Sequence, residues 1–196
     1  ITNRYGQIHY EKRARKGITL LEATRKMRQR TYFGTMMVEL GEADAFISGQ
    51  NRNYPDTIRP ALEIIGKEEG TNKVAGMYII MSKQGPLFFA DTTVNIDPTS
   101  DDLVDIVKLI HKSVNKLQIK PRIAMLSYSN FGSAKGKTVT NIQKALKRLN
   151  TENPEILVDG EMQANTALDA ELRQELFPFC KLGSENANVF IFPALS

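Results

Sequence analysis

The clearest pattern along this chain of 196 residues is a helical spacing of apolar side chains that begins after residue 100. Apolar residues recur there every three or four positions, which is the period of a helix with one buried face. These residues are Leu103, Ile106, Val107, Ile110 and Val114. Thr99 or Ser100 can cap the free amides of such a helix. We therefore predict a helix that begins at about residue 100.

Helices and strands are predicted to alternate along the rest of the chain. The other predicted helices span residues 20–30, 32–40, 56–65, 139–149 and 169–177, and the predicted strands span residues 43–48, 74–82, 87–94, 122–126, 156–158 and 189–192. Thr19 and Glu22 match a capping box at the start of the first of these helices. Residues 83–86, which contain Gly-Pro, predict a hairpin turn between two strands.

This alternation indicates the α/β class: a mainly parallel sheet with helices on both faces. A chain of this length fits one domain or one lobe of a larger fold, and we expect residues 1–196 to form a single lobe. Residues 1–42 are expected to form a basic helical segment that packs on this lobe.

Four predicted strands end in loops of small or polar residues. In open α/β sheets, ligands bind beyond the carboxyl ends of the strands, where such loops gather. The loop at residues 127–136 combines hydroxyl groups, glycines and a lysine between a strand and a helix, a composition that suits phosphate. If the loops converge, they form one polar cleft; they span residues 48–57, 127–136, 159–165 and 193–196.

Simpler interpretations of the same residues stay open. A phosphate-binding loop of the nucleotide hydrolases requires four residues between its glycines, and only three separate Gly132 from Gly136. The 127–136 loop also fits an ordinary strand-to-helix turn. Asp159 suits a general acid–base pair with Glu161 or a helix cap. Arg59 suits either a bound anion or an ion pair within its helix.

Positive charge is concentrated at the start of the chain. Residues 1–30 contain nine Lys and Arg against two Glu, whereas the whole chain has a net charge of +4. Such a segment suits nucleic acid, an anionic cofactor, an acidic protein surface or simply a solvated helix face. No zinc knuckle, helix-turn-helix pattern or interleaving of aromatic residues supports nucleic acid.

The cysteine and histidine counts exclude two other kinds of site. One Cys and two His provide neither a disulfide framework nor a cysteine zinc site. No apolar run has the length of a membrane-spanning helix, and no signal-peptide pattern is present. We therefore expect a cytoplasmic protein with no metal site in these residues and no membrane partner.

Several motifs together resemble the phosphate acetyl/butyryl transferase family. Members of that family move an acyl group between phosphate and coenzyme A, and their active site lies in the cleft between two α/β lobes. The motifs follow the family's order along nearly the whole chain: Ser48-Gly49 and residues 56–62 (DTIRPAL), 89–95 (FADTTVN), 97–99 (DPT), 126–129 (LSYS), 158–163 (VDGEMQ) and 188–193 (NVFIFP).

Within this family, the chain is most similar to the C-terminal phosphotransacetylase-like domain of large bacterial malic enzymes. The reasons are residues 52–57 (RNYPDT), 129–133 (SNFGS) and 159–165 (DGEMQAN). True phosphotransacetylases tend to carry His-Ser-Thr where this chain has residues 52–54. The resemblance implies a regulatory domain that binds acetyl-CoA or a related anionic metabolite and supports a homodimer or higher homo-oligomer. It implies NAD(P) and Mg or Mn only in the remaining domains of a malic enzyme, whose oxidoreductase chemistry is absent from these residues.

Two alternatives to the regulatory domain stay open. The chain can be part of an active phosphate acetyltransferase, or it can be a basic nucleic-acid-binding module. In active transferases, a Ser-Arg-Gly segment and an aspartate lie beyond the Phe-Pro strand, so we expect this stretch alone to lack catalytic residues and activity. The loops and the resemblance together predict an acyl-CoA or phosphate site. Its predicted residues are Ser127, Ser129, Asn130, Gly132, Ser133, Lys135, Arg52, Tyr54, Asp56, Thr57, Arg59, Asp159, Glu161 and Gln163.

Overall fold

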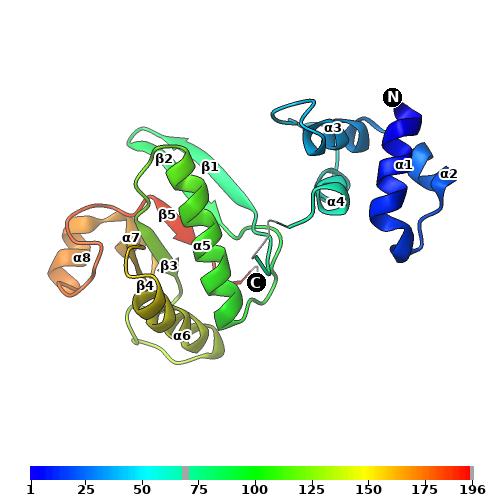
Figure 1. Ribbon diagram of the computed structural model, residues 1–196. Coiled ribbons are helices and arrows are strands. Elements are labelled where there is room, and N and C mark those ends of the chain that lie inside the picture. The colour runs from blue at the N-terminus through cyan, green and yellow to red at the C-terminus, as the bar shows by residue number, and fades with distance from the viewer. Residues whose placement is uncertain (68–70, 195–196) are drawn as a thin grey trace. The chain divides into compact units, whose positions relative to one another are not determined.

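The computed structural model describes residues 1–67 and 71–194. The chain forms two compact units, Ile1–Glu69 and Gly70–Ser196, which follow one another in Figure 1. The first unit thus extends past residue 42 and includes one helix more than the predicted basic segment. How this unit packs on the rest of the lobe stays a prediction.

The first unit consists of short helices around a small apolar core. The helices are α1 (Thr2–Arg13), a 3₁₀ turn (Ala14–Lys16), α2 (Leu20–Lys26), α3 (Arg30–Glu39) and α4 (Tyr54–Ile64). The core contains Tyr5, Met27, Tyr32, Met36 and Ile64. The predicted capping box of Thr19 and Glu22 is confirmed at the start of α2, which ends at Lys26 rather than at residue 30.

The strand predicted over residues 43–48 is wrong, because this segment is irregular. A strand needs a neighbour to satisfy its backbone groups, and the described part of the first unit contains no other strand. The segment instead packs along α3. The ring of Phe46 lies so close to Gly34 that a Cβ at position 34 would be 2.4 Å from it, so only glycine permits this approach.

The second unit contains the five-stranded sheet that the alternation predicts. Its strands are β1 (Met77–Ser82), β2 (Gly85–Ala90), β3 (Ile123–Leu126), β4 (Val158–Met162) and β5 (Val189–Ile191). They lie in the order β1-β2-β5-β3-β4. The hairpin pair β1 and β2 is antiparallel, and β2, β5, β3 and β4 are parallel, which confirms a mainly parallel α/β sheet.

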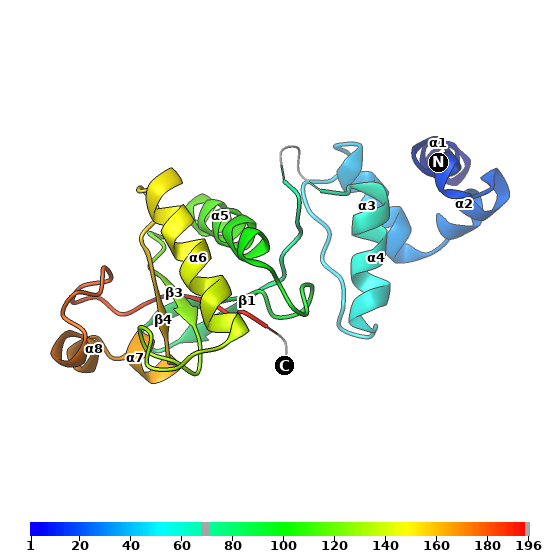
Figure 2. The ribbon, with the colours of Figure 1, turned by 90° about the horizontal axis from the view of Figure 1, so that it is seen from below.

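Helices cover both faces of this sheet. Figure 2 shows α5 (Ser100–Lys116) and α6 (Lys137–Glu152) on one face and α7 (Ala164–Leu168), which is followed by α8 (Ala170–Leu176), on the other. The connections from β2 to β3 and from β3 to β4 contain α5 and α6 and lead toward the β4 edge of the sheet. The connection from β4 to β5 contains α7 and α8 and leads back toward β2. Since parallel crossovers are right-handed, reversing direction requires the opposite face.

Alternating strand residues divide the core in two. Ile123 and Met125 pack in the cluster with α5 and α6, whereas Ala124 and Leu126 pack in the cluster on the other face. The predicted helix that starts at residue 100 is confirmed, with a capping box between Thr99 and Asp102. None of the helices in the described residues combines the length and apolarity needed to cross a bilayer.

The position of β4 differs from the sequence prediction. The predicted strand ends at residue 158, but β4 begins there and runs to Met162. Asp159 and Glu161 are therefore strand residues rather than loop residues. The Asp-Gly pair suggests a turn, but hydrogen bonds from distant segments satisfy both carboxylates within the strand.

Candidate functional site

The loop after β3 folds around the carboxylate of Glu161, which is only 1% exposed. Its Oε1 accepts hydrogen bonds from Ser129 Oγ at 3.0 Å and from the Gly132 amide at 2.6 Å. Its Oε2 accepts a hydrogen bond from the side-chain amide of Gln143 in α6 at 3.2 Å. A buried carboxylate requires such donors. Glu161 therefore holds the 127–136 loop in its conformation through these hydrogen bonds.

Further hydrogen bonds join the 127–136 loop to the end of β4. The Gln163 amide donates to Asn130 Oδ1 at 2.7 Å, and the Gln163 side chain donates to the Tyr128 carbonyl at 2.9 Å. Within the loop, the Asn130 amide donates to Ser133 Oγ at 2.9 Å, and Ser129 Oγ accepts from the Ala134 amide at 3.0 Å.

The structure thus brings together most of the site residues predicted in the second unit. Ser129, Asn130, Gly132, Ser133, Glu161 and Gln163 belong to one network. Ser129 and Glu161 are buried, and the Gly132 amide donates to Glu161. These groups build the frame of the loop. Contact between this network and a ligand stays a prediction.

Two lysines near the loop differ in their surroundings. Lys137 forms an ion pair with Asp97 at 2.6 Å. Lys135 is exposed, and its ammonium has no ion-pair partner among the described residues. Lys135 is thus the cation of this loop that is available to a phosphate.

A pocket of about 400 Å³ lies at the carboxyl ends of the neighbouring strands β3 and β5. Hydroxyl groups of Ser127, Tyr128 and Thr138 belong to its lining, and Thr138 lies in the first turn of α6, where free backbone amides favour an anion. No carboxylate, imidazole or amine occurs among the described residues of the lining. The described lining offers hydroxyl groups of the kind that donate to phosphate oxygens, but it supplies no base. It is lined by Leu126, Ser127, Tyr128, Thr138, Ala164, Phe192, Pro193 and Ala194.

Asp159 has a separate role from Glu161. Asp159 Oδ2 accepts a hydrogen bond from the Lys181 amide at 2.7 Å and so ties β4 to the segment before β5. The two carboxylates bind different partners, and neither an acid–base pair nor a helix cap at Asp159 is supported. Burial, with a smaller contribution from Asp159, raises the pKa of the adjacent Cys180 thiol to about 11.

The motif at residues 89–95 organises the loop after β2. The carboxylate of Asp91 is buried, and its Oδ1 accepts hydrogen bonds from the amides of Gly76 at 2.9 Å and of Thr93 and Val94 at 3.2 Å. Its Oδ2 accepts a hydrogen bond from the Asn95 amide at 2.7 Å. Asp91 thus acts as a structural anchor for this loop.

In the first unit, a polar pocket of about 560 Å³ surrounds the 48–53 loop and the first turn of α4. Two predicted residues, Arg52 and Asp56, line it. Tyr54, Thr57 and Arg59 also lie on α4 but outside this lining. Their approach to the 127–136 loop stays a prediction. The lining consists of Arg30, Thr31, Phe46, Ile47, Ser48, Gly49, Asn51, Arg52, Asn53 and Asp56.

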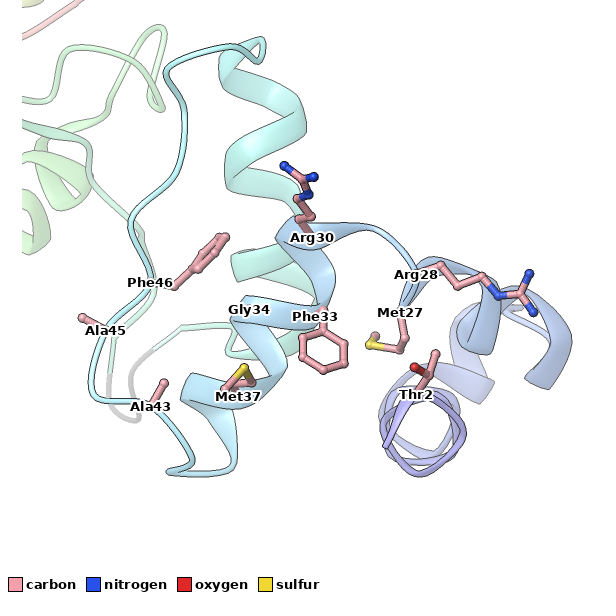
Figure 3. A pocket seen from close by; sticks show the side chains of 10 residues that line it. All are labelled: Thr2, Met27, Arg28, Arg30, Phe33, Gly34, Met37, Ala43, Ala45 and Phe46. Atoms are coloured by element: carbon pink, nitrogen blue, oxygen red, sulfur yellow. The ribbon is translucent and has the colours of Figure 1, made fainter.

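Arg30 was not predicted as a site residue. It lies on α3, more than 20 positions before Arg52, and no local motif marks it. A second, more apolar pocket of about 590 Å³ shares Arg30 and Phe46 with the first. Figure 3 shows Phe33 and Met37 on α3 and Phe46 on the neighbouring segment. Segment 43–46 thus helps to form both pockets.

A buried polar cluster in the first unit is structural rather than catalytic. Glu63 accepts hydrogen bonds from Lys26 Nζ at 2.9 Å and Tyr32 OH at 2.8 Å, and His9 Nε2 lies 3.8 Å from Glu63 Oε2. Burial, followed by the charge of Lys26, lowers the pKa of His9. Because His9 is fully buried, it has no access to a substrate.

Comparison with known proteins gives consistent matches. The family model described as phosphate acetyl/butaryl transferase matches residues 2–196. Phosphate acetyltransferase from Clostridium acetobutylicum is 35% identical over 99% of this chain and 60% of its own length. The Bacillus subtilis enzyme is 38% identical over 92% of this chain and 56% of its own length. A phosphotransacetylase structure from Streptococcus pyogenes is 32% identical over 99% of this chain and 58% of that chain, with a TM-score of 0.82.

These matches correct the assignment to a malic-enzyme regulatory domain and to an oxidoreductase. The alignments cover 60% and 56% of the two phosphate acetyltransferases, which are 35% and 38% identical to the chain, and the Streptococcus pyogenes phosphotransacetylase structure has the same fold; an NADP-dependent malic enzyme from Salmonella typhimurium is 33% identical. The alternative of a phosphate acetyltransferase fits these findings better. The chain thus spans less than two thirds of the length of these relatives. With residues 2–196 matched, it belongs to the phosphate acetyl/butaryl transferase family.

Proposed function

We propose that the protein carrying this chain transfers an acyl group between phosphate and coenzyme A. The observation that carries the proposal is the family match over residues 2–196, together with the hydroxyl-lined pocket at the carboxyl ends of β3 and β5. The relatives named phosphate acetyltransferase make acetyl the expected acyl group.

The proposed reaction joins the sulfur of coenzyme A to the carbonyl carbon of an acyl phosphate. The bond between that carbon and the phosphate oxygen breaks, and inorganic phosphate leaves. The hydroxyl groups of Ser127 and Thr138 would donate to phosphate oxygens, and the amino end of α6 would stabilise their charge. Lys135 would add a cation at the rim. The proton of the thiol requires a base from outside the described lining of this pocket.

The polar pocket of the first unit is proposed as a second site for an anionic group. Arg52 and Arg30 line this pocket, and the planar fork of a guanidinium matches the geometry of phosphate. Tyr54, Thr57 and Arg59 are proposed to extend this site along α4. Glu161 and Gln163 act as positioning residues because they hold the 127–136 loop. A homodimer or higher homo-oligomer stays a prediction that light scattering can check.

Binding to the intact protein tests this proposal. Acetyl phosphate and coenzyme A would be titrated by calorimetry into the unaltered protein and into Ser127→Ala, Thr138→Val and Thr151→Val variants. Thr151 is a matched control, because it lies in the last turn of α6 and its hydroxyl donates to the Lys147 carbonyl at 3.0 Å. Loss of one hydrogen bond to a charged phosphate oxygen is expected to weaken acetyl phosphate binding by about tenfold or more.

The control variant is expected to bind acetyl phosphate like the unaltered protein. Equal affinities for Thr138→Val and Thr151→Val would contradict the assignment of phosphate to this pocket. Failure of the intact protein to bind either coenzyme A or acetyl phosphate would contradict the proposed activity itself.

A further inference from the structure

A basic pocket of about 420 Å³ lies between the end of α1 and the helix α2 in the first unit. It shares no lining residue with the two pockets of that unit described above. Four of its residues are cationic and one is acidic. The lining consists of Arg13, Lys16, Gly17, Ile18, Glu22, Arg25, Lys26 and Gln29.

Three of these cations form no ion pair with the described residues. Lys26 forms an ion pair with Glu63 at 2.9 Å. The carboxylate of Glu22 accepts hydrogen bonds from the amide and the hydroxyl of Thr19, both at 3.0 Å, as part of the capping box. Arg13, Lys16 and Arg25 have no ion-pair partner among the described residues. The pocket therefore holds an excess of positive charge.

Two other cations of the basic segment are paired with carboxylates. Arg4 pairs with Glu42 at 3.0 Å, and Lys12 pairs with Glu39. Over residues 1–69, twelve Lys and Arg are opposed by nine Asp and Glu. A polynucleotide needs a continuous row of phosphate contacts. Arg15, Arg28 and Arg30 also have no ion-pair partner among the described residues, but they lie outside this lining. The grouping of Arg13, Lys16 and Arg25 around one concavity favours a small anion at this place.

We propose that this pocket binds a small molecule through a diphosphate group. Two guanidinium groups can each bind phosphate oxygens in a bidentate manner, and an ammonium group adds a point charge. The amide of Gln29 supplies a neutral donor beside them. Arg13, Lys16 and Arg25 outweigh the single carboxylate of Glu22 in the lining, so the pocket keeps a net positive charge that suits a diphosphate. The site stands apart from the transferase pockets and does not depend on the proposed activity.

Calorimetric titration with inorganic pyrophosphate tests this proposal. The variants are Lys16→Gln and Arg25→Gln, both at exposed positions, and the matched control is Arg15→Gln, which removes one charge from the same segment outside the pocket lining. Each pocket variant is expected to bind pyrophosphate about tenfold more weakly, since a hydrogen bond to a charged group is lost. The control is expected to change the affinity for pyrophosphate by less than about twofold, because the charge of Arg15 lies outside the lining and is screened by salt.

Two further titrations separate the possible ligands. ADP is expected to bind at the same site, with the same sensitivity to Arg25→Gln, if the diphosphate group is what is recognised. Sulfate at equal ionic strength is expected to bind more weakly than pyrophosphate. The Thr138→Val variant is expected to leave pyrophosphate binding at this site unchanged, which distinguishes it from the phosphate pocket of the second unit.

Several results would overturn the proposal. One is an equal loss of affinity in Arg15→Gln and Arg25→Gln, which would indicate diffuse attraction to the whole segment. Another is binding of a short single-stranded oligonucleotide that is tighter than that of ADP and equally sensitive to Arg15→Gln. Absence of saturable pyrophosphate binding to variants that melt like the unaltered protein would also refute it.

Discussion

Replacing Glu161 by alanine would remove the acceptor that holds the loop after β3. Three donors would lose their partner: the Ser129 hydroxyl, the Gly132 amide and the Gln143 side chain. Ser129 is buried, so water cannot easily replace the carboxylate there. We predict that the alanine variant destabilises the second unit and loosens the 127–136 loop.

The expected magnitude follows from these three contacts. Each hydrogen bond to a charged group contributes about 1.5–3 kcal/mol, but keeping a carboxylate buried costs several kcal/mol. We therefore expect Glu161→Ala to lower the free energy of unfolding by about 2–4 kcal/mol. Glu161→Gln keeps an oxygen for Ser129 and Gly132 but directs an amide group at Gln143. Its expected cost is about 1 kcal/mol.

Urea unfolding followed by circular dichroism would measure these changes, and hydrogen exchange would report on the Gly132 amide. In the alanine variant, that amide is expected to exchange about tenfold faster for each 1.4 kcal/mol of lost local stability. A change below about 0.5 kcal/mol with unaltered exchange would refute the reasoning. Loss of coenzyme A binding in Glu161→Gln at unchanged stability would instead show that Glu161 contacts the ligand.

Three other predictions concern single residues. Gly160→Ala is expected to cost about 2–3 kcal/mol, because φ is +146° and a Cβ would lie 2.7 Å from the Met125 carbonyl oxygen; an unchanged melting temperature would contradict this. Cys180, with a pKa of about 11 caused mainly by burial, is expected to react with a thiol reagent at pH 8 about 100-fold more slowly than free cysteine, and fast labelling of the folded protein would be the opposite result. His9 has a lowered pKa in the folded protein, so below about pH 6.5 the unfolded chain binds a proton that the folded first unit does not. The urea concentration at the unfolding midpoint of that unit is therefore expected to decrease as the pH is lowered from about 7.5 to about 5.5. His9→Gln should flatten this dependence, and an unaltered slope would disprove the role of His9.

Sequence periodicity predicted the parts of the fold whose signals are local. The helix α5 has five apolar residues at helical spacing and a capping residue, and both features agree with the structure. The hairpin of β1 and β2 likewise has a turn signal between two apolar runs. These elements are specified by residues that are neighbours in the sequence.

Other features depend on contacts between distant residues and were not predicted. The segment at residues 43–48 has strand-like composition but no neighbouring strand among the described residues of its unit. The sequence predicts Asp159 and Glu161 in a loop. In the structure they lie in β4, and each carboxylate accepts a hydrogen bond from a donor more than 20 positions away. The role of Glu161 as the anchor of the 127–136 loop follows only from the pairing of β3 with β4.

Part of the site could be predicted from the sequence. The carboxyl ends of parallel strands meet at one edge, so the proximity of the 127–136 loop and Gln163 followed from the fold class. The roles within that region did not follow, because hydrogen bonds that hold the loop and hydrogen bonds that bind a ligand use the same residue types. Thr138 and Phe192 line the pocket there but were not among the predicted site residues, although Phe192 belongs to the motif at residues 188–193.

The most direct test of the central claim is the formation of a thioester from acetyl phosphate and coenzyme A by the intact protein, followed by its ultraviolet absorbance. Acyl transfer predicts enzyme-dependent acetyl-CoA formation, competitive inhibition by inorganic phosphate against acetyl phosphate, and a raised KM for acetyl phosphate in Thr138→Val but not in Thr151→Val. Absence of thioester formation by folded protein that binds both substrates would contradict the proposed transferase activity.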